Sequence, residues 1–218
     1  MDEFSTEDEQ VEEIRKWWSE NWKQVTGGLA IGLALIFGYR GMIDARHAKA
    51  EQASQQYELL QEAVASNDVA SAEGVLAALK DEYASTPYLD QANMMLARLS
   101  VENGDLDIAA QRLGSVLEAS DKELARVARL RLARIKKEQG EYDAALELVS
   151  GADYGAFSGL FADVRGDIHV AAGHADEARA AYEEALDLAN ENLVNRELIE
   201  MKLSMLAQPI VSTNGDDG

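Results

Sequence analysis

The sequence predicts an all-α protein in which one N-terminal transmembrane helix precedes a right-handed α-solenoid of paired helices. The 218-residue chain is rich in Ala, Leu and Glu and has only 2 prolines, a composition that favours helices. Residues 24–39 contain no charged side chain, as expected of a membrane span. A glycine followed by an alanine-rich stretch then recurs three times at nearly constant spacing, which indicates a repeat architecture.

Residues 1–23 form an acidic segment with the pattern of an amphipathic helix. Val11, Ile14, Trp18, Trp22 and Val25 follow one another at intervals of three or four residues. This spacing places them on one face of a helix. We expect that helix to lie on the bilayer surface and to continue into the membrane span.

Residues 24–43 are predicted to cross the membrane. The uncharged run QVTGGLAIGLALIFGY would measure about 24 Å as a helix, which is shorter than a hydrocarbon core of about 30 Å. Flanking aromatic and cationic side chains suit the membrane interfaces and complete the span. These interface residues are Trp17, Trp18, Trp22, Lys23, Tyr39 and Arg40.

The apolar segment is interpreted as a retained anchor that binds the lipid bilayer. A cleaved signal peptide would begin with a short basic region and end in a small-x-small site, whereas here 23 mostly acidic and polar residues come first. Three Lys or Arg side chains lie before the run and three follow soon after, so charge alone leaves the orientation open. Gly28 and Gly32 form a G-x-x-x-G pattern that permits close packing of a second helix, so a homodimer is also left open.

Residues 44–207 are predicted to form the repeat domain. Gly104, Gly140 and Gly173 lie 36 and 33 residues apart, and each should form the tight turn within a helix pair. Small residues should let the paired helices approach closely. They fall at Ala97, Ala133 and Gly166 in the first helices and at Ala109, Ala145 and Ala178 in the second, with bulky residues at Leu113, Val149 and Tyr182.

Further helices are expected on both sides of these repeats. One of about residues 45–66 should continue from the membrane and pair with residues 69–83. Pro87 suits the first turn of the next helix, and residues 191–207 should form the last one. Residues 208–218 have the composition of a disordered tail.

Composition and motifs argue against several functional classes. The net charge of −20, from 40 acidic and 20 basic residues, would repel nucleic acid. The absence of cysteine excludes disulfides and thiolate chemistry. We expect the three histidines, His47, His169 and His174, to be surface or packing residues and not metal ligands. We therefore expect a non-enzymatic protein with no metal and no cofactor.

The chain resembles the YfgM-like tetratricopeptide family, the ancillary subunits of the bacterial Sec translocon. The likeness covers residues 1–207 and is carried by DEQVEEIRKWWSENW, an anchor that ends in GYR, the run LRLARI, and ADVRGDI before the last repeat. It implies an inner-membrane protein with its N-terminus in the cytoplasm and its repeats in the periplasm. It also implies as partners the Sec translocon subunits, a membrane-anchored periplasmic chaperone and newly exported chains. A regulatory adaptor that sequesters an envelope-stress response regulator is the alternative.

A basic cluster on the predicted helix 121–139 is the one departure from the acidic background. Its members are Lys122, Arg126, Arg129, Arg131, Arg134, Lys136 and Lys137. Pairing with neighbouring acidic helices is the simpler interpretation. In tetratricopeptide arrays, however, the first helix of each repeat lines a concave groove, where Arg98 and Arg134 would be equivalent and could bind a carboxylate. The predicted groove residues are Met94, Arg98, Val101, Leu130, Arg134, Lys137, Asp163, Asp167 and Val170.

Overall fold

The computed structural model describes residues 3–151, 154–188 and 193–207, and side chains from residue 10 onward. Within these ranges the chain is helical and contains no strand, in agreement with the predicted fold class. The chain divides into two compact units, Met1–Gln52 and Ala53–Gly218. The predicted tail, residues 208–218, lies outside the described residues.

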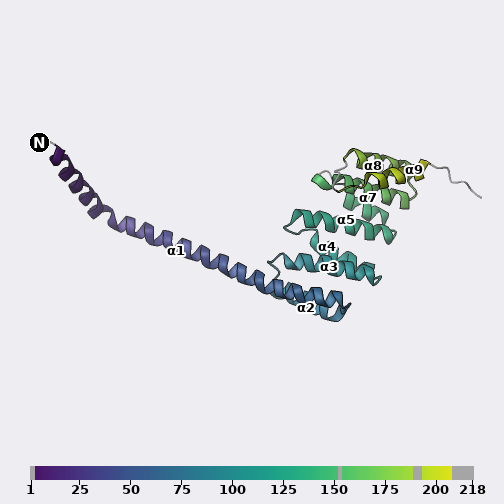
Figure 1. Cartoon of the computed structure of the whole chain (residues 1–218), viewed down its shortest axis with the longest axis horizontal. Coiled ribbons are helices and arrows are strands. Elements are labelled where there is room, and N and C mark those ends of the chain that lie inside the picture. Colours follow the sequence, from purple (N-terminus) through teal and green to yellow (C-terminus); the bar gives the residue numbers. More distant parts are fainter. Residues whose placement is uncertain (1–2, 152–153, 189–192, 208–218) are drawn as a thin grey trace, which may run out of the picture. The chain divides into compact units, whose positions relative to one another are not determined.

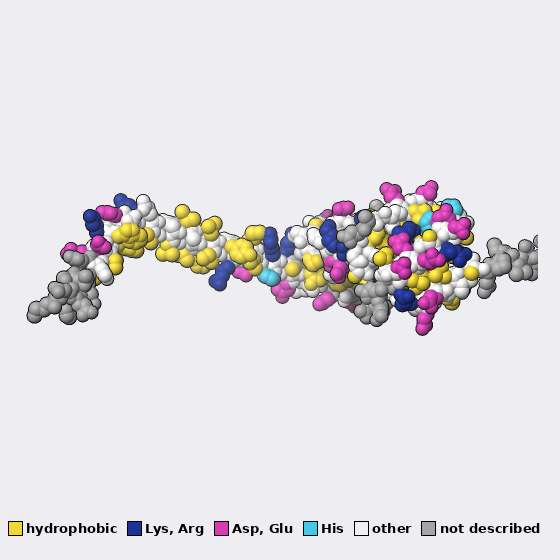
Figure 2. Space-filling model, turned by 90° about the horizontal axis from the view of Figure 1, so that it is seen from above, with side chains coloured by type: hydrophobic (Ala, Val, Ile, Leu, Met, Phe, Trp, Pro, Cys, Tyr) yellow, Lys and Arg dark blue, Asp and Glu magenta, His cyan; other side chains and the backbone are white. Residues whose placement is uncertain are grey.

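The first unit is formed by helix α1, which begins at Glu3 and continues to Ala65 in the second unit (Figure 1). The predicted amphipathic segment, membrane span and following helix are therefore one uninterrupted helix. Hydrophobic side chains cover its middle part (Figure 2). They are exposed on every side: Leu29, Ile31, Leu33, Leu35, Ile36 and Phe37. A water-soluble helix would bury such residues on at least one face.

The second unit is a stack of helix pairs (Figure 1). Consecutive helices from α2 to α9 pack against one another, and α5 also contacts α7. Their bounds are α2 Val69–Glu82, α3 Tyr88–Glu102, α4 Leu106–Val116, α5 Lys122–Glu138, α6 Tyr142–Val149, α7 Ser158–Ala171, α8 Ala175–Asp187 and α9 Arg196–Ala207.

Two elements differ from the sequence prediction. Helix α9 begins at Arg196 rather than near residue 191, because the side chain of Asn195 accepts a hydrogen bond from the backbone N–H of Leu198 and caps the first turn. Between α6 and α7 the chain forms a short 3₁₀ helix, Gly155–Phe157, that the repeat pattern did not predict. Tyr154 stacks on Phe161 there, with ring centroids 3.5 Å apart, and this contact closes the core beneath the irregular segment.

The three predicted turn glycines share one backbone geometry. Gly104, Gly140 and Gly173 have φ of 83°, 77° and 81°, which glycine adopts without a steric penalty. In the first of these turns, the N–H of Asp105 donates to the carbonyl of Ser100, and the other two repeat this bond. The pattern is the hydrogen-bonded C-terminal motif that satisfies the last carbonyls of a helix. The predicted role of these glycines is confirmed.

The small residues predicted at the helix contacts are buried. In the α3–α4 pair, Ala97 and Ala109 lie against Leu113 in one core cluster. In the α7–α8 pair, the missing Cβ of Gly166 leaves room for the ring of Tyr182. The same arrangement in successive pairs aligns the first helices α3, α5 and α7, which sets the geometry of the surface described next.

Candidate partner-binding site

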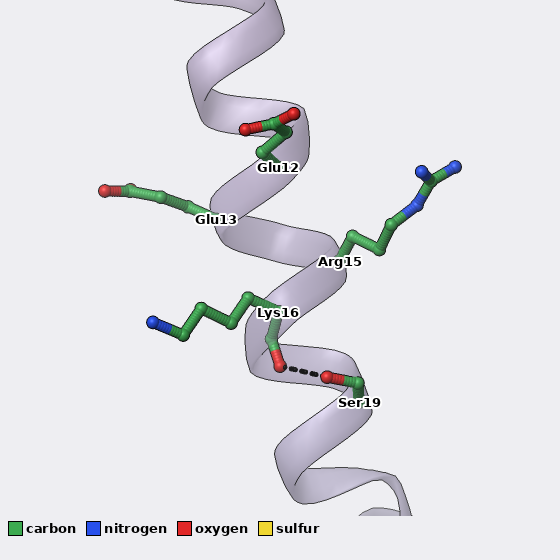
Figure 3. A pocket seen from close by; sticks show the side chains of 5 residues that line it. All are labelled: Glu12, Glu13, Arg15, Lys16 and Ser19. Atoms are coloured by element: carbon green, nitrogen blue, oxygen red, sulfur yellow. Dashed lines mark hydrogen bonds between the residues drawn. The ribbon is translucent and has the colours of Figure 1, made fainter.

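A depression along α1 does not form a site among its described residues. Figure 3 shows that its described lining residues, Glu12, Glu13, Arg15, Lys16 and Ser19, come from one helical segment and point in different directions. The hydroxyl of Ser19 donates to the backbone carbonyl of Lys16 at 2.8 Å. The five described side chains do not converge on a common point.

A cleft of about 250 Å³ lies between α3, α4 and α5. Its floor consists of apolar side chains that belong to the core, and its rim carries guanidinium groups and one exposed valine. The lining residues are Met94, Ala97, Arg98, Val101, Leu113, Arg131, Arg134 and Ile135. Five of the eight are apolar, so the cleft offers a water-accessible opening onto the hydrophobic core.

Helix periodicity explains how the sequence builds this cleft. On α3, Met94, Arg98 and Val101 follow at intervals of four and three residues and therefore share a face. On α5, Arg131 and Arg134 are three residues apart, and Ile135 adjoins them on the same side. The two faces meet because α3 and α5 are the first helices of successive pairs.

The positive charge at the rim is only slightly neutralised within the protein. Nε of Arg98 donates to Oε1 of Glu102 at 2.7 Å, but this ion pair is exposed and of the kind that contributes little. Arg131 and Arg134 are exposed and form no ion pair with any residue in the described ranges. The cleft therefore combines an apolar floor with available cationic donors.

The predicted acidic groove residues lie in a different cluster. Nζ of Lys202 on α9 donates to Oδ1 of Asp163 at 2.7 Å and to Oδ1 of Asp167 at 2.6 Å. The hydroxyl of Tyr182 donates to Asp167 at 2.8 Å. Asp163 and Asp167 thus fasten α9 and α8 to α7 through side chains that are largely withdrawn from solvent.

Burial dominates the electrostatics of this cluster. It raises the pKa of Asp163 above its ordinary value, although the nearby ammonium of Lys202 and, at longer range, the charge of Arg134 oppose the shift. Burial alone would lower the pKa of Lys202, but its two carboxylate partners raise it. Lys202 is therefore a stable cation that compensates two carboxylates, one of which is costly to ionise.

The other predicted groove residues are placed as follows. Leu130 is buried in the core between α5 and α7, because it points away from the cleft. Nζ of Lys137 lies 3.0 Å from a carboxylate oxygen of Glu138. Val170 is exposed on α7. Four predicted residues thus line the cleft together: Met94, Arg98, Val101 and Arg134.

Four cleft residues were not among the predicted groove residues: Ala97 and Leu113, which were predicted as helix contacts, and Arg131 and Ile135, for which the sequence carries a detectable signal. Arg131 belonged to the recognised basic cluster, and Ile135 is one residue beyond Arg134. Aligning equivalent positions of the repeats selects one residue per turn of each helix. Arg131 and Ile135, which adjoin the selected Arg134 on the helix surface, were therefore not selected. The full helical face at 131, 134 and 135 would have included them.

A comparison with protein families identifies the repeat architecture. The model of the tetratricopeptide repeat-like domain matches residues 15–208, which is most of the chain. The chain belongs to this family.

Relatives are similar over almost their whole length. A protein of Escherichia coli (strain K12) named "Ancillary SecYEG translocon subunit" is 28% identical over 95% of this chain and 100% of its own length. Proteins of the same name from Aggregatibacter actinomycetemcomitans and Haemophilus influenzae are 27% and 28% identical over 92% and 93% of this chain, and over 97% and 99% of their own lengths. The predicted resemblance is confirmed.

The predicted membrane-interface residues all lie in the first unit. Trp17, Trp18, Trp22 and Tyr39 are about half exposed or more, and α1 is the one described helix long and apolar enough to span a bilayer. Its composition fits a single-pass inner-membrane protein. A Cβ at Gly28 or Gly32 would meet nothing within 4 Å, so this face of the helix is open, and a homodimer through it stays a prediction.

Proposed function

We propose that the chain is a non-enzymatic adaptor associated with the Sec translocon and anchored in the inner membrane by α1. The relatives named as ancillary SecYEG translocon subunits support this function, because they align with both the membrane helix and the repeats. The structural observation that supports this function is one exposed apolar helix followed by a helical-repeat unit. Within the described residues, no His, Asp or Glu group is arranged to hold a metal.

The proposal extends to orientation and to the kind of client. We place the N-terminus in the cytoplasm and the repeats in the periplasm, where they assist a membrane-anchored chaperone with newly exported chains. Anchoring keeps the repeats close to the membrane and raises their effective concentration for emerging chains without a new contact. No turnover is needed for such a role, and a repeat surface that binds segments of other proteins is sufficient.

Site-specific photocrosslinking in native membranes tests the association. A photoreactive side chain at Leu35, in the exposed part of the span, should capture translocon subunits, and one at Val101 should capture chaperone or exported chains. A probe at Leu188, also exposed on the repeat unit, serves as the control for unspecific capture. Failure of the Leu35 probe to reach any translocon subunit would refute the proposal.

Protease treatment of spheroplasts tests the orientation separately. The repeat unit should be digested when only the outer membrane is opened, whereas epitope tags at the N-terminus should be protected. Protection of the repeats would reverse the orientation. Crosslinks to a cytoplasmic response regulator alone would favour the stress-regulatory adaptor over the export adaptor.

A further inference from the structure

We propose that the cleft between α3, α4 and α5 binds an acidic segment of a partner protein, with one apolar side chain inserted and its carboxylates held by Arg131 and Arg134. This inference rests on the proposed adaptor function and specifies the chemistry of the segment that the adaptor recognises.

The floor requires an apolar occupant. Met94, Leu113 and Ile135 belong to the buried core cluster of the α3–α5 region, yet their side chains also line an opening to solvent. Water in contact with such a surface is unfavourable, and an inserted hydrocarbon group would remove it. Val101, which is 44% exposed, extends the apolar lining outward to the rim.

The size of the cleft favours one side chain of a polypeptide. Its volume of about 250 Å³ lies below the usual range for small-molecule sites, roughly 300–1,000 Å³. A lipid also combines an apolar part with an anionic group, but a cleft of about 250 Å³ is small for a complete acyl chain. A peptide instead places an apolar side chain and carboxylates within a few residues of each other.

The rim determines the charge of the occupant. Arg98, Arg131 and Arg134 surround the opening in a chain whose net charge is −20. Guanidinium groups bind carboxylates through paired hydrogen bonds of well-defined geometry. Because Arg131 and Arg134 form no ion pair with any described residue, a partner's carboxylates need not displace an existing contact there.

The other basic face of α5 provides a matched control. Arg126 and Arg129 line a separate depression that also contains Glu118. That depression contains an acidic residue and its lining is less apolar. We therefore expect it to bind acidic, apolar peptides weakly. Substituting these two arginines removes the same charge from the same helix at a different place.

Fluorescence anisotropy with the full chain in zwitterionic lipid nanodiscs tests the proposal. The probe is a labelled Gly/Ser peptide that carries one leucine flanked by glutamates. We expect it to bind, and we expect replacement of leucine by serine to weaken binding by at least about tenfold. The double variant Arg131→Gln/Arg134→Gln should weaken it by about tenfold or more, whereas Arg126→Gln/Arg129→Gln should change it by less than about twofold.

A single substitution provides an independent check. Val101→Glu places a carboxylate at the rim and should repel the peptide, and because Val101 is partly exposed its replacement should leave the core intact. Circular dichroism should give the same helix content for all variants. Tight binding of the probe to Val101→Glu would contradict the proposed position of the segment.

Three outcomes would overturn the proposal. They are no detectable binding of the glutamate–leucine peptide, equal binding of a lysine–leucine peptide, and equal loss in both double arginine variants. Binding of the wild type to phosphatidylglycerol vesicles that is lost only in Arg131→Gln/Arg134→Gln would assign the cleft to a lipid instead.

The same variants separate this inference from the proposed function. If Arg131→Gln/Arg134→Gln loses the peptide but keeps the translocon crosslink from Leu35, the cleft recognises clients and the adaptor function stands. If the wild type binds the peptide but gives no translocon crosslink, the cleft chemistry stands and the Sec association fails.

Discussion

Replacing Gly166 with alanine should destabilise the α7–α8 pair by about 2 kcal/mol. A Cβ at this position would lie 2.4 Å and 2.5 Å from two ring atoms of Tyr182. The ring cannot move away easily, because it is 2% exposed and its hydroxyl is bonded to Asp167. Overpacking of this kind costs about 1–3 kcal/mol, and we expect the upper end for two ring contacts. The higher helix propensity of alanine returns about 1 kcal/mol.

Thermal unfolding of the full chain in detergent, followed by circular dichroism, measures this effect. A loss of about 2 kcal/mol corresponds to a Tm lower by roughly 4–8 °C for a chain of this size. Gly114→Ala is the matched control, since its Cβ would meet nothing within 4 Å, and it should raise stability by about 0.5–1 kcal/mol.

A double-mutant cycle identifies the cause. Tyr182→Leu removes the ring that clashes, so adding Gly166→Ala to that variant should cost much less than it costs in the wild type. If Gly166→Ala is as stable as the wild type, or if its cost is unchanged in the Tyr182→Leu background, the close packing of α7 on Tyr182 does not explain the glycine.

Three further substitutions give separate tests. Gly104→Ala forces a Cβ into the left-handed conformation at φ 83° and should lower the free energy of unfolding in urea by about 1–2 kcal/mol, whereas an unchanged midpoint would contradict the turn geometry. Asp163→Asn tests the raised pKa of that carboxyl: the folded wild type binds protons more readily than the unfolded chain, so its stability falls as pH rises from the ordinary value of 3.8 through the raised pKa. The asparagine variant lacks this loss, so its stability relative to the wild type should increase over that pH window in urea titrations, and a constant difference would refute the assignment. Leu33→Lys should make membrane insertion of α1 less favourable by about 3–4 kcal/mol, because the cost of lysine adds to the lost contribution of leucine. A larger fraction of the variant should be released by alkaline extraction, and full retention would count against residues 24–43 as the span.

The sequence predicted the repeat elements well because their signals are local. A turn with positive φ can be recognised from a glycine at constant spacing, and Gly104, Gly140 and Gly173 all adopt it. A helix contact can be recognised from a small residue at a fixed distance from that turn, and Ala97 and Ala109 are both buried. Both signals depend on short-range geometry, so no knowledge of the neighbouring repeat was needed.

The candidate site was harder to predict because it depends on contacts between helices distant in sequence. Asp163 and Asp167 occupy groove-equivalent positions on α7, but Lys202 lies 39 and 35 residues further on and binds both. Their use in holding α9 could not be inferred from repeat spacing. Leu130 is a second example. From the sequence its position in α5 suits either the cleft or the core, and in the structure it packs in the core against the following helices.

The predicted groove positions of the repeat unit separate into a structural part on α7 and a proposed recognition part on α5. Towards the C-terminal end, the charges on α7 are compensated by Lys202 and are withdrawn from solvent. On α5, Arg131 and Arg134 remain exposed beside an apolar floor. Because a buried compensated charge binds poorly to an outside group and an exposed guanidinium beside hydrocarbon binds well, selectivity for an acidic partner should reside between α3 and α5. Exchanging Asp163 for asparagine should therefore leave binding of the glutamate–leucine peptide unchanged, even though it alters the pH dependence of stability.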